Sequence, residues 1–386
     1  MDEKLKQIRD ALDRIDKSII ESLAKRQEVI QQVSSLKIEE QGAIRDHERE
    51  EQLLQRITNL AREHGLDRYF AEQLYRDILD HSVRFQTHSL VDHQNKKGKQ
   101  ESVSVAYQGT EGAFSHQAAF RHFEERYSEV KSYGYDTFKQ AADSVMKGEH
   151  NYAILPIENT TAGSINETYD ILGEDNLHIV GEEVIRIIHC LLALESIPVD
   201  RIRRIMSHPQ AIAQCSNFLA GLHRCKVESY IDTAMAAKKV VEDGDLSQAA
   251  IAGAHAADLY GLQILERDIA NQKENFTRFV IVAPEPIHCD PQIPCKTSML
   301  LVTGHQQGDL VGCLNILADR GINMVKLESR PKPNEPWKYQ FYLDIEGNMD
   351  NPDVDAALDE LRDKSSSLKI LGCYPTQMGW HSDEQD

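Results

Sequence analysis

The first helical stretch of the chain carries cationic side chains where its apolar stripe predicts hydrophobic ones. Read at alternating steps of three and four residues, five positions of this stripe are apolar. Arg9, Arg26 and Lys37 share the stripe, seventeen and eleven residues apart, and the second interval is close to three whole turns of a helix. One alternative is that these side chains reach water along a solvated edge. The interpretation we favour is a cationic pocket inside a helical bundle, suited to a substrate with more than one carboxylate.

Polar strings in the middle of the chain hold a second group of candidates. Gly109–His116 follows a predicted strand and leads into a helix. A glycine turn before a helix N-terminus commonly binds an anion, but as often it is only a tight turn. Pro156–Ser164 places polar side chains at the C-terminal end of a predicted strand, the usual position of a site in an α/β sheet. Ser207–Gln214 is a loop entering a helix, for which an N-cap and proline turn is the alternative. Asn275–Phe279 precedes a strongly apolar strand, and taken alone it indicates only polarity at a strand edge.

The elements that must position these residues fall into three segments. Residues 1–92 are predicted to be all-helical, with helices over roughly 5–40, 45–64 and 67–88. Residues 93–102 are a polar linker, and over residues 103–284 short apolar runs alternate with helical patterns, which indicates an α/β domain. After a proline-rich boundary, residues 297–376 follow a βαββαβ order, the ferredoxin-like α+β arrangement. The predicted fold class is therefore multidomain.

The first helix is too long for its own domain. About thirty-five residues span roughly 50 Å, more than a three-helix domain of ninety residues can cover. Its apolar stripe therefore predicts an intertwined homodimer, or a higher homo-oligomer, with one pocket drawing residues from two chains.

Composition excludes several classes of function. The 386 residues carry a net charge of −19, which argues against nucleic acid or an anionic membrane as the main partner. No run of eighteen apolar residues is present, and Met1–Lys4 lacks a signal-peptide pattern. Seven scattered cysteines without CxxC spacing favour free thiols in a reducing compartment. We therefore expect a cytoplasmic protein without a metal or cofactor.

The helical segment resembles the AroQ-class chorismate mutases, whose active-site set it matches in register across eighty residues. The matching positions are Arg9, Arg26, Lys37, Asp46, Arg49, Glu50, Ser82 and Gln86. The resemblance implies that Arg26 and the partner chain's Arg9 bind the two carboxylates of chorismate, and that Lys37 and Gln86 donate to its ether oxygen. It further implies that Glu50, with Asp46 nearby, binds the ring hydroxyl, while Ser82 and Arg49 complete the polar wall. A Claisen rearrangement needs only a folded substrate and fixed donors at the oxygen that gains charge, so no cofactor is implied.

The four middle strings together resemble the prephenate dehydratase family over residues 103–284, with Thr277-Arg278-Phe279 as the most distinctive triplet. The resemblance implies two lobes of the periplasmic-binding-protein type, residues 103–190 with 265–284 and residues 191–264, with prephenate between them. Thr277 is expected against the leaving hydroxyl, Glu158 as proton donor if burial raises its pKa, and Arg278 as carboxylate clamp. The remaining predicted site residues are Asn159, Gln214, Ser207, Phe279, Thr160 and Ser115.

The C-terminal segment resembles an ACT domain, a fold that binds amino acids at dimer interfaces. Two strings match the phenylalanine-binding motifs of the dehydratase family, and their predicted ligand-binding residues are Gly308, Leu310, Val311, Glu328, Ser329, Arg330 and Pro331. One departure is Asp309, where the family usually has alanine; an acid there either repels the ligand's carboxylate or attracts its ammonium group. Taken alone, the second string is equally a strand that ends in a turn. The whole chain thus resembles bifunctional enzymes of phenylalanine biosynthesis that act on chorismate and prephenate under feedback by phenylalanine.

Two other classes of function are alternatives. A transcriptional regulator with a helical DNA-binding head requires a basic face, but residues 1–90 hold fifteen Lys and Arg against eighteen Asp and Glu. A binding protein that has lost catalysis is disfavoured because every mutase position and the Thr-Arg-Phe triplet are intact. The sequence therefore favours a bifunctional enzyme.

Overall fold

A computed structural model describes residues 2–40, 46–95, 101–174, 176–304, 306–332, 335 and 337–377. The chain forms two compact units, residues 1–98 with 378–386 and residues 99–377. The predicted helix break near Gly42 and most of the predicted linker lie outside the described residues. Among the described helices, none combines the length and apolar character that crossing a bilayer requires.

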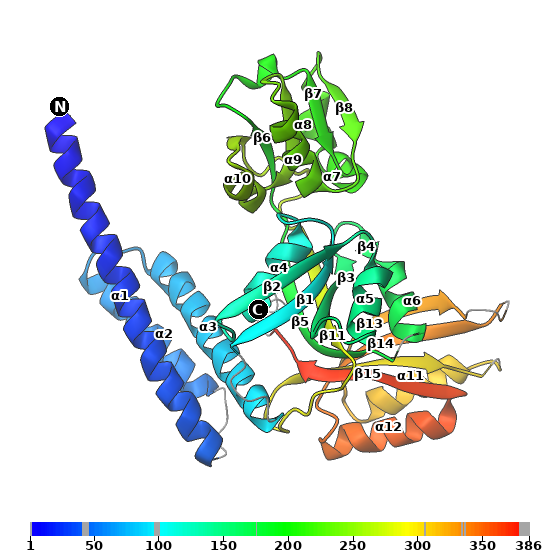
Figure 1. Cartoon of the computed structure of the whole chain (residues 1–386). Coiled ribbons are helices and arrows are strands. Elements are labelled where there is room, and N and C mark those ends of the chain that lie inside the picture. Colours follow the sequence, from blue (N-terminus) through cyan, green and yellow to red (C-terminus); the bar gives the residue numbers. More distant parts are fainter. Residues whose placement is uncertain are drawn as a thin grey trace. The chain divides into compact units, whose positions relative to one another are not determined.

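The helical unit consists of α1 (Asp2–Glu40), α2 (His47–Glu63) and α3 (Arg68–Gln94), which confirms the three predicted helices (Figure 1). Asp46 and Asp67 are the N-cap residues of α2 and α3, and their carboxylates accept hydrogen bonds from the backbone N–H groups of Arg49 and Phe70. Between them the chain turns at Gly65, whose φ of +70° favours glycine.

The N-terminal half of α1 exposes an apolar stripe. Ile8, Leu12, Ile15 and Ile19 are each more than half exposed. At 39 residues, α1 is about 58 Å long, and α2 and α3 form their own buried contact through Ile57, Ala61 and Ala71. An exposed stripe of this length supports the predicted intertwined dimer, which stays a prediction.

The first lobe of the large unit is built on a sheet in the order β2-β1-β3-β11-β5, with the short β4 on β3. The β11 strand returns from the far end of the dehydratase segment and lies antiparallel between β3 and β5. One face of the sheet packs on α4, and the other packs on α5 and α6. The strands are β1 (Ser102–Gln108), β2 (Glu129–Tyr135), β3 (Tyr152–Asn159), β4 (Gly163–Ser164), β5 (His178–Arg186) and β11 (Phe276–Ala283), and the helices are α4 (Phe114–Phe123), α5 (Phe138–Met146) and α6 (Asn166–Glu174).

The second lobe has its own sheet, in the order β10-β6-β9-β7-β8, with helices on both faces. The chain enters this lobe between β5 and β6 and leaves it between β10 and β11, so two crossings join the lobes. This division agrees with the two predicted lobes (Figure 1). The elements are β6 (His189–Ala193), η1 (Val199–Arg201), β7 (Arg204–Ser207), α7 (Pro209–Gln214), α8 (Ser216–Ala220), β8 (Lys226–Ser229), α9 (Thr233–Asp243), β9 (Gln248–Gly253), α10 (Ala254–Tyr260) and β10 (Gln263–Glu266).

The C-terminal domain, residues 295–375, has the predicted βαββαβ order. Its antiparallel sheet runs β13-β14-β12-β15, with α11 and α12 on one face. The other face packs on the first lobe, where Leu300, Tyr342 and Leu371 join the same buried cluster as Leu172 and Ile179. The elements are β12 (Cys295–Val302), α11 (Asp309–Asp319), β13 (Met324–Pro331), β14 (Tyr339–Glu346), α12 (Pro352–Lys364) and β15 (Ser367–Pro375).

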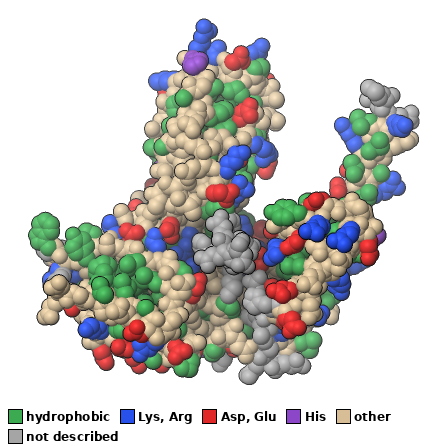
Figure 2. Space-filling model, turned by 180° about the vertical axis from the view of Figure 1, so that it is seen from behind, with side chains coloured by type: hydrophobic (Ala, Val, Ile, Leu, Met, Phe, Trp, Pro, Cys, Tyr) green, Lys and Arg blue, Asp and Glu red, His purple; other side chains and the backbone are tan. Residues whose placement is uncertain are grey.

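The C-terminal domain also exposes hydrophobic side chains to solvent. Val311, Trp337 and Tyr339 are the most exposed of them, and Val325 and Leu327 follow along β13. Figure 2 shows hydrophobic side chains gathered over this domain. This exposed apolar surface is compatible with the dimer interface that the resemblance to an ACT domain implies.

Candidate active sites

Arg26 and Ser82 join α1 to α3 in the helical unit. Arg26 Nη1 donates a hydrogen bond of 2.5 Å to Ser82 Oγ, which in turn donates to the carbonyl oxygen of Ile78 at 2.7 Å. Burial lowers the pKa of Arg26, and Tyr75 opposes this shift. The guanidinium is therefore a half-buried cation held on α3.

Gln86 lies one turn beyond Ser82 on the same face of α3. The residue is 7% exposed, and its Nε2 donates to the backbone oxygen of Ser82 at 3.2 Å. Its Oε1 accepts no hydrogen bond from any residue that the structure describes. A buried amide with unused hydrogen-bonding capacity is suited to a polar ligand.

Lys37 lies near two carboxylates. Burial lowers the pKa of Lys37, while the charges of Asp46 and Glu50 raise it in part. Asp46 also caps α2, since its Oδ1 accepts from the backbone N–H of Arg49 at 3.0 Å. A half-buried ammonium group near two carboxylates thus lies on the C-terminal part of α1.

Arg9 and Arg49 are exposed in the single chain. Arg9 precedes Arg26 by seventeen residues of continuous helix, about 25 Å along the axis. The two guanidinium groups therefore cannot meet at one substrate within one chain. This separation is compatible with the expected role of Arg9 in the partner chain's pocket.

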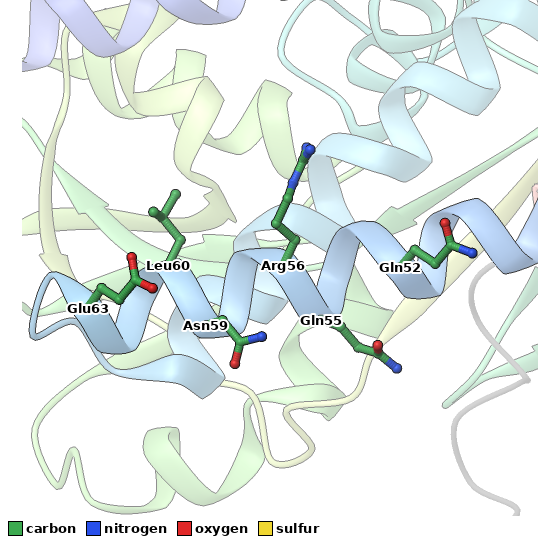
Figure 3. Close-up of a pocket in the computed structure, with 6 residues that line it drawn as sticks. All are labelled: Gln52, Gln55, Arg56, Asn59, Leu60 and Glu63. Atoms are coloured by element: carbon green, nitrogen blue, oxygen red, sulfur yellow. The ribbon is translucent and has the colours of Figure 1, made fainter.

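Hollows formed by described residues of the helical unit include the following two. One, of about 670 Å3 between α1 and α3, is lined mostly by apolar side chains and includes Arg26 and Tyr75. The other, of about 450 Å3, is a shallow surface feature of α2 alone (Figure 3), lined by Gln52, Gln55, Arg56, Asn59, Leu60 and Glu63. None of the predicted mutase residues lines this second hollow, so it is not the mutase site.

The two lobes meet at three amide side chains, which we call the amide cluster: Asn159, Gln214 and Asn275. Asn159 Nδ2 donates to Asn275 Oδ1 at 2.8 Å, and Asn275 Nδ2 donates to Gln214 Oε1 at 3.1 Å. Gln214 Nε2 lies 3.4 Å from Asn159 Oδ1, which closes the ring of contacts. Asn159 ends β3, Gln214 ends α7 and Asn275 precedes β11, so the cluster joins both lobes where the chain crosses between them.

Thr277 is held by the amide cluster. Its Oγ1 accepts a hydrogen bond of 2.9 Å from Asn159 Nδ2, and the residue is 8% exposed. Within the described part of the chain, the Thr277 hydroxyl donates to no acceptor. The hydroxyl proton of Thr277 is therefore available for a ligand. The structure thus brings together the predicted residues Thr277, Asn159 and Gln214.

Three further residues of this region were not among the predicted site residues. Thr161 donates to Asn159 Oδ1 at 2.7 Å and accepts from Gln214 Nε2. The polar strings contained Thr161 and Asn275, so both could have been included. His189, whose Nε2 is 2.8 Å from Gln214 Oε1, lies in an apolar run and gave only the signal of a polar residue inside it.

Three other predicted substrate-binding residues of the large unit are Ser207, Thr160 and Ser115. Ser207 is fully buried and its hydroxyl donates to the carbonyl oxygen of Ile251 at 2.6 Å. Thr160 Oγ1 accepts from the backbone N–H of Phe276 at 2.9 Å, which fixes the loop after β3. Ser115 lies in the first turn of α4 and is 8% exposed. The contacts of Ser207 and Thr160 indicate structural roles, and ligand contacts of all three residues stay predictions.

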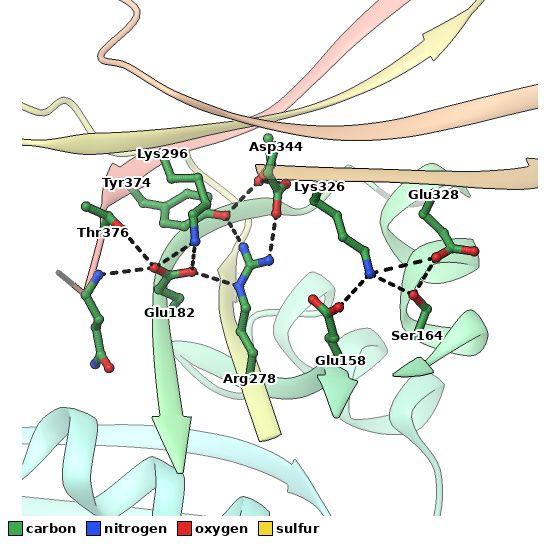
Figure 4. Close-up of polar contacts among 12 residues, drawn as sticks. Glu158, Ser164, Glu182, Arg278, Lys296, Lys326, Glu328, Asp344, Tyr374 and Thr376 are labelled. Carbon is green, nitrogen blue, oxygen red and sulfur yellow. Dashed lines mark hydrogen bonds and ion pairs between the residues drawn. The ribbon is translucent and has the colours of Figure 1, made fainter. Parts of the chain in front are cut away.

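Glu158 and Arg278 point away from the amide cluster, so these contacts do not support their predicted roles as proton donor and carboxylate clamp, which stay predictions. Glu158 Oε1 accepts from Lys326 Nζ at 2.7 Å, on the C-terminal domain (Figure 4). Arg278 is opposite Glu158 in the sheet, and both face that domain. The physical reason is that the side chains of adjacent strand residues point to opposite faces of the sheet. Thr277 and Asn159 point to the contact between the lobes, so their neighbours Arg278 and Glu158 point the other way.

A β-bulge sets this orientation. In the pairing of β3 with β11, Phe279 is opposite Pro156 and Arg278 is opposite Glu158, so Ile157 has no partner. The extra residue reverses the alternation at the end of β3 and turns Asn159 toward Thr277. Phe279 is 2% exposed in the core beneath α4 with Ile154 and Ile281. This buried position does not support its predicted contact with substrate, which stays a prediction.

Arg278 is the centre of an ionic network of five residues, Glu182, Arg278, Lys296, Asp344 and Tyr374 (Figure 4). Arg278 donates to Glu182 Oε2 at 2.8 Å, to Asp344 Oδ2 at 2.6 Å and to the Tyr374 hydroxyl at 2.8 Å. Burial alone lowers the pKa of Arg278, but Asp344, Tyr374 and Glu182 outweigh this and hold it well above its usual value. The network joins β11 and β5 of the first lobe to β12, β14 and β15.

Contacts between the lobes also fix the loop after β1. Asp232 Oδ2 accepts from the backbone N–H of Thr110 at 3.2 Å, while its Oδ1 caps α9 through Ala234. The Tyr260 hydroxyl donates to the carbonyl oxygen of Glu111 at 2.6 Å. The lobes are therefore also joined at the loop after β1.

The predicted ligand-binding strings of the C-terminal domain lie on α11 and β13. Gly308 adopts a φ of +89° before α11, and Leu310 and Val311 follow in its first turn, Val311 being 59% exposed. Asp309 Oδ2 accepts from the backbone N–H of Gln306 at 2.9 Å, so this acid has a structural role in the loop.

The β13 string alternates between two environments. Glu328 accepts from Ser164 Oγ at 2.5 Å, and Arg330 pairs with Asp170 at 2.7 Å, both on the first lobe. Ser329 and Pro331 are exposed. Binding of a ligand by this string stays a prediction.

Comparison with known proteins identifies the family. Residues 8–87 match the family model of chorismate mutase type II, and residues 105–287 match that of prephenate dehydratase. The chain is 37% identical over 370 residues to the bifunctional chorismate mutase/prephenate dehydratase of Escherichia coli K12, with 96% of each chain covered.

Two solved structures are similar to part of this chain, each with a TM-score of 0.64. The prephenate dehydratase of Arthrobacter aurescens in complex with L-Phe is 27% identical and covers 71% of this chain and 90% of its own. GqqA, described as a quorum-quenching acylase, is 35% identical and covers 71% of this chain and 98% of its own. With both domains matched and nearly the whole length aligned to a bifunctional relative, the chain belongs to the family of bifunctional chorismate mutase/prephenate dehydratases.

Proposed function

We propose that the helical unit rearranges chorismate to prephenate and that the large unit converts prephenate to phenylpyruvate, water and carbon dioxide. The observation that carries the second half is the Thr277 hydroxyl, whose oxygen is held by Asn159 and whose proton is available at the interlobe contact. Family membership supports both halves.

In the mutase, Arg26 binds a carboxylate of chorismate while Ser82 fixes the guanidinium on α3. Lys37 and Gln86 donate to the ether oxygen as its bond to carbon breaks and negative charge develops there. The half-burial of Arg26 and Lys37 strengthens these charge interactions, because less water competes for them. Arg9 of a second chain binds the other carboxylate, for which the exposed apolar stripe of α1 provides the dimer contact.

In the dehydratase, the ring carboxylate leaves as carbon dioxide and the electron pair of its bond enters the ring. The ring then expels its hydroxyl group, which takes up a proton and leaves as water. Thr277 donates the hydrogen bond that makes this hydroxyl a better leaving group, and Asn159 Nδ2 stabilises the charge that develops on Thr277 Oγ1. Glu158 has no place in this scheme because it faces the C-terminal domain.

We also propose that the C-terminal domain is an ACT domain that binds phenylalanine and inhibits the dehydratase. The βαββαβ order, the L-Phe complex of the Arthrobacter aurescens relative and the ionic network beneath Thr277 support this. L-Phenylalanine is then expected to slow phenylpyruvate formation at concentrations where D-phenylalanine does not. A cytoplasmic location and the homodimer stay predictions.

The experiment that tests the proposal uses purified full-length protein and chorismate. Loss of the diene absorbance reports the mutase, and phenylpyruvate measured in alkali reports the dehydratase. Supplying prephenate directly separates the two reactions. If neither chorismate loss nor phenylpyruvate appears, the chain is a binding protein and the proposal fails.

A further inference from the structure

His189 is a buried histidine in contact with the dehydratase site. It begins β6, directly after the chain crosses into the second lobe, and is only 3% exposed. Its Nε2 lies 2.8 Å from Gln214 Oε1. The Phe114 ring packs edge-on against the imidazole, with the two ring centroids 5.8 Å apart. No described residue offers a partner to its Nδ1. The single polar contact of the ring is therefore to the amide cluster.

The hydrogen atoms of Gln214 fix the direction of that contact. Gln214 Nε2 donates to Thr161 Oγ1 and to Asn159 Oδ1, so both of its hydrogens are used. Gln214 Oε1 accepts from Asn275 Nδ2 and faces His189. A reversed amide would place Nε2 against the Asn275 amide nitrogen and Oε1 against the Asn159 oxygen, with two repulsive contacts. His189 must therefore carry its hydrogen on Nε2 and act as the donor.

The ring is neutral in this arrangement. A proton on Nδ1 would be buried without an acceptor, which is unfavourable. Burial lowers the pKa of His189, and the hydrogen bond with Gln214 opposes this in part. The Nε2–H tautomer is thus maintained near neutral pH.

The chain of contacts continues to the reacting group. His189 donates to Gln214, Gln214 and Asn275 orient the amide of Asn159, and Asn159 Nδ2 donates to Thr277 Oγ1. We propose that His189 is a positioning residue of the dehydratase, which holds the amide of Gln214 so that Asn159 donates to Thr277 and the Thr277 proton stays directed to the leaving hydroxyl. This inference rests on the proposed dehydratase function.

The competing explanation is that His189 only fills space beneath Phe114. Three variants separate the two. In His189→Gln the amide nitrogen can reach the position of Nε2 and donate to Gln214. In His189→Asn the nitrogen is closer to the position of Nδ1, so a side chain of similar polarity cannot make the contact. His189→Leu keeps volume and removes the donor.

If His189 positions the cluster, His189→Asn and His189→Leu lower kcat for supplied prephenate by roughly 100-fold, while KM changes by less than about threefold. His189→Gln retains kcat to within roughly tenfold of the wild type. Equal losses in His189→Gln and His189→Asn, or near-normal kcat in His189→Leu, would overturn the proposal. Should His189→Leu fail to fold, the comparison of the Gln and Asn variants still decides.

A double variant provides a second readout that space-filling would not produce. With His189→Leu and Gln214→Leu combined, we expect a loss in kcat no greater than that of the more damaging single change, because both break the same chain of contacts. Multiplication of the two losses would show independent roles and contradict the proposal. Chorismate consumption by the same protein reports an intact helical unit. Absence of phenylpyruvate from the wild type would instead refute the dehydratase function itself.

Discussion

Thr277 and Arg278 are consecutive in β11, yet their side chains belong to different parts of the molecule. Thr277 Oγ1 is 2.9 Å from Asn159 at the contact between the lobes, whereas Arg278 Nη1 is 2.6 Å from Asp344 of the C-terminal domain. The residue that carries the proposed reacting hydroxyl is therefore joined by one peptide bond to the central residue of the ionic network. A displacement of the C-terminal sheet would act on Arg278 and, through the shared backbone, on the orientation of Thr277.

Replacing Thr277 tests the reacting hydroxyl. Thr277→Val keeps the shape of the side chain and removes the donor, so kcat for prephenate is expected to fall by roughly 10²- to 10⁴-fold. Prephenate should then accumulate when chorismate is supplied, as measured by its conversion to phenylpyruvate on acid treatment. Thr277→Ser, which keeps a hydroxyl, is the matched control and should retain most activity. Comparable losses in both variants would remove the hydroxyl from the mechanism.

Replacing Lys37 tests the independence of the two sites. Lys37→Ala removes the cation expected at the ether oxygen, and chorismate consumption should fall by at least roughly 10²-fold. Dehydration of supplied prephenate should be unchanged, because the proposed dehydratase residues all lie within residues 99–377. Lys25→Ala, at an exposed position of the same helix, is the control for charge loss. Loss of both activities in Lys37→Ala would contradict separate sites.

Local patterns in the sequence predict much of this structure. The helical and strand periodicities place all three N-terminal helices and the βαββαβ order, because each pattern is repeated over several turns or alternations. The polar strings identify Asn159, Gln214 and Thr277, which meet in space although more than fifty residues separate each from the next. These residues meet because β11 returns along the chain to pair with β3.

The site expectations that these contacts do not support have one physical origin. A strand pattern states that Glu158 and Asn159 face opposite sides, but it does not state which side is the site. That choice depends on the bulge at Ile157 and on the C-terminal domain, whose Lys326 and Asp344 attract Glu158 and Arg278. Residues more than 160 positions from Glu158 thus decide its environment. His189 was missed because a single histidine in an apolar run has no local signature of a contact with Gln214.

Replacing Arg278 tests the ionic network. Arg278→Met leaves the buried carboxylates of Glu182 and Asp344 without their shared guanidinium, and removing one partner of a buried pair typically costs about 3–5 kcal/mol. Urea unfolding of the large unit should show this loss of stability. The matched control is Arg186→Met in the neighbouring strand, whose ion pair with Glu274 is exposed and is expected to contribute less than about 1 kcal/mol. Equal effects would mean that burial of the network has little energetic consequence.

Acid should reveal the contribution of Glu182. Burial alone raises the pKa of this carboxyl, but Arg278 and Lys296 outweigh burial and lower it to about 2. Because the folded-state pKa lies below the unfolded value of 4.5, Glu182 stabilises the fold fully above about pH 4.5. That contribution, of the order of 3 kcal/mol, is lost as pH falls from about 4.5 toward 2. Urea unfolding at successive pH values should show Glu182→Gln less stable than the wild type at pH 7. The difference should shrink steadily below pH 4.5, since other carboxylates titrate alike in both proteins. A difference that does not change with pH would show that Glu182 is not held ionised by Arg278 and Lys296.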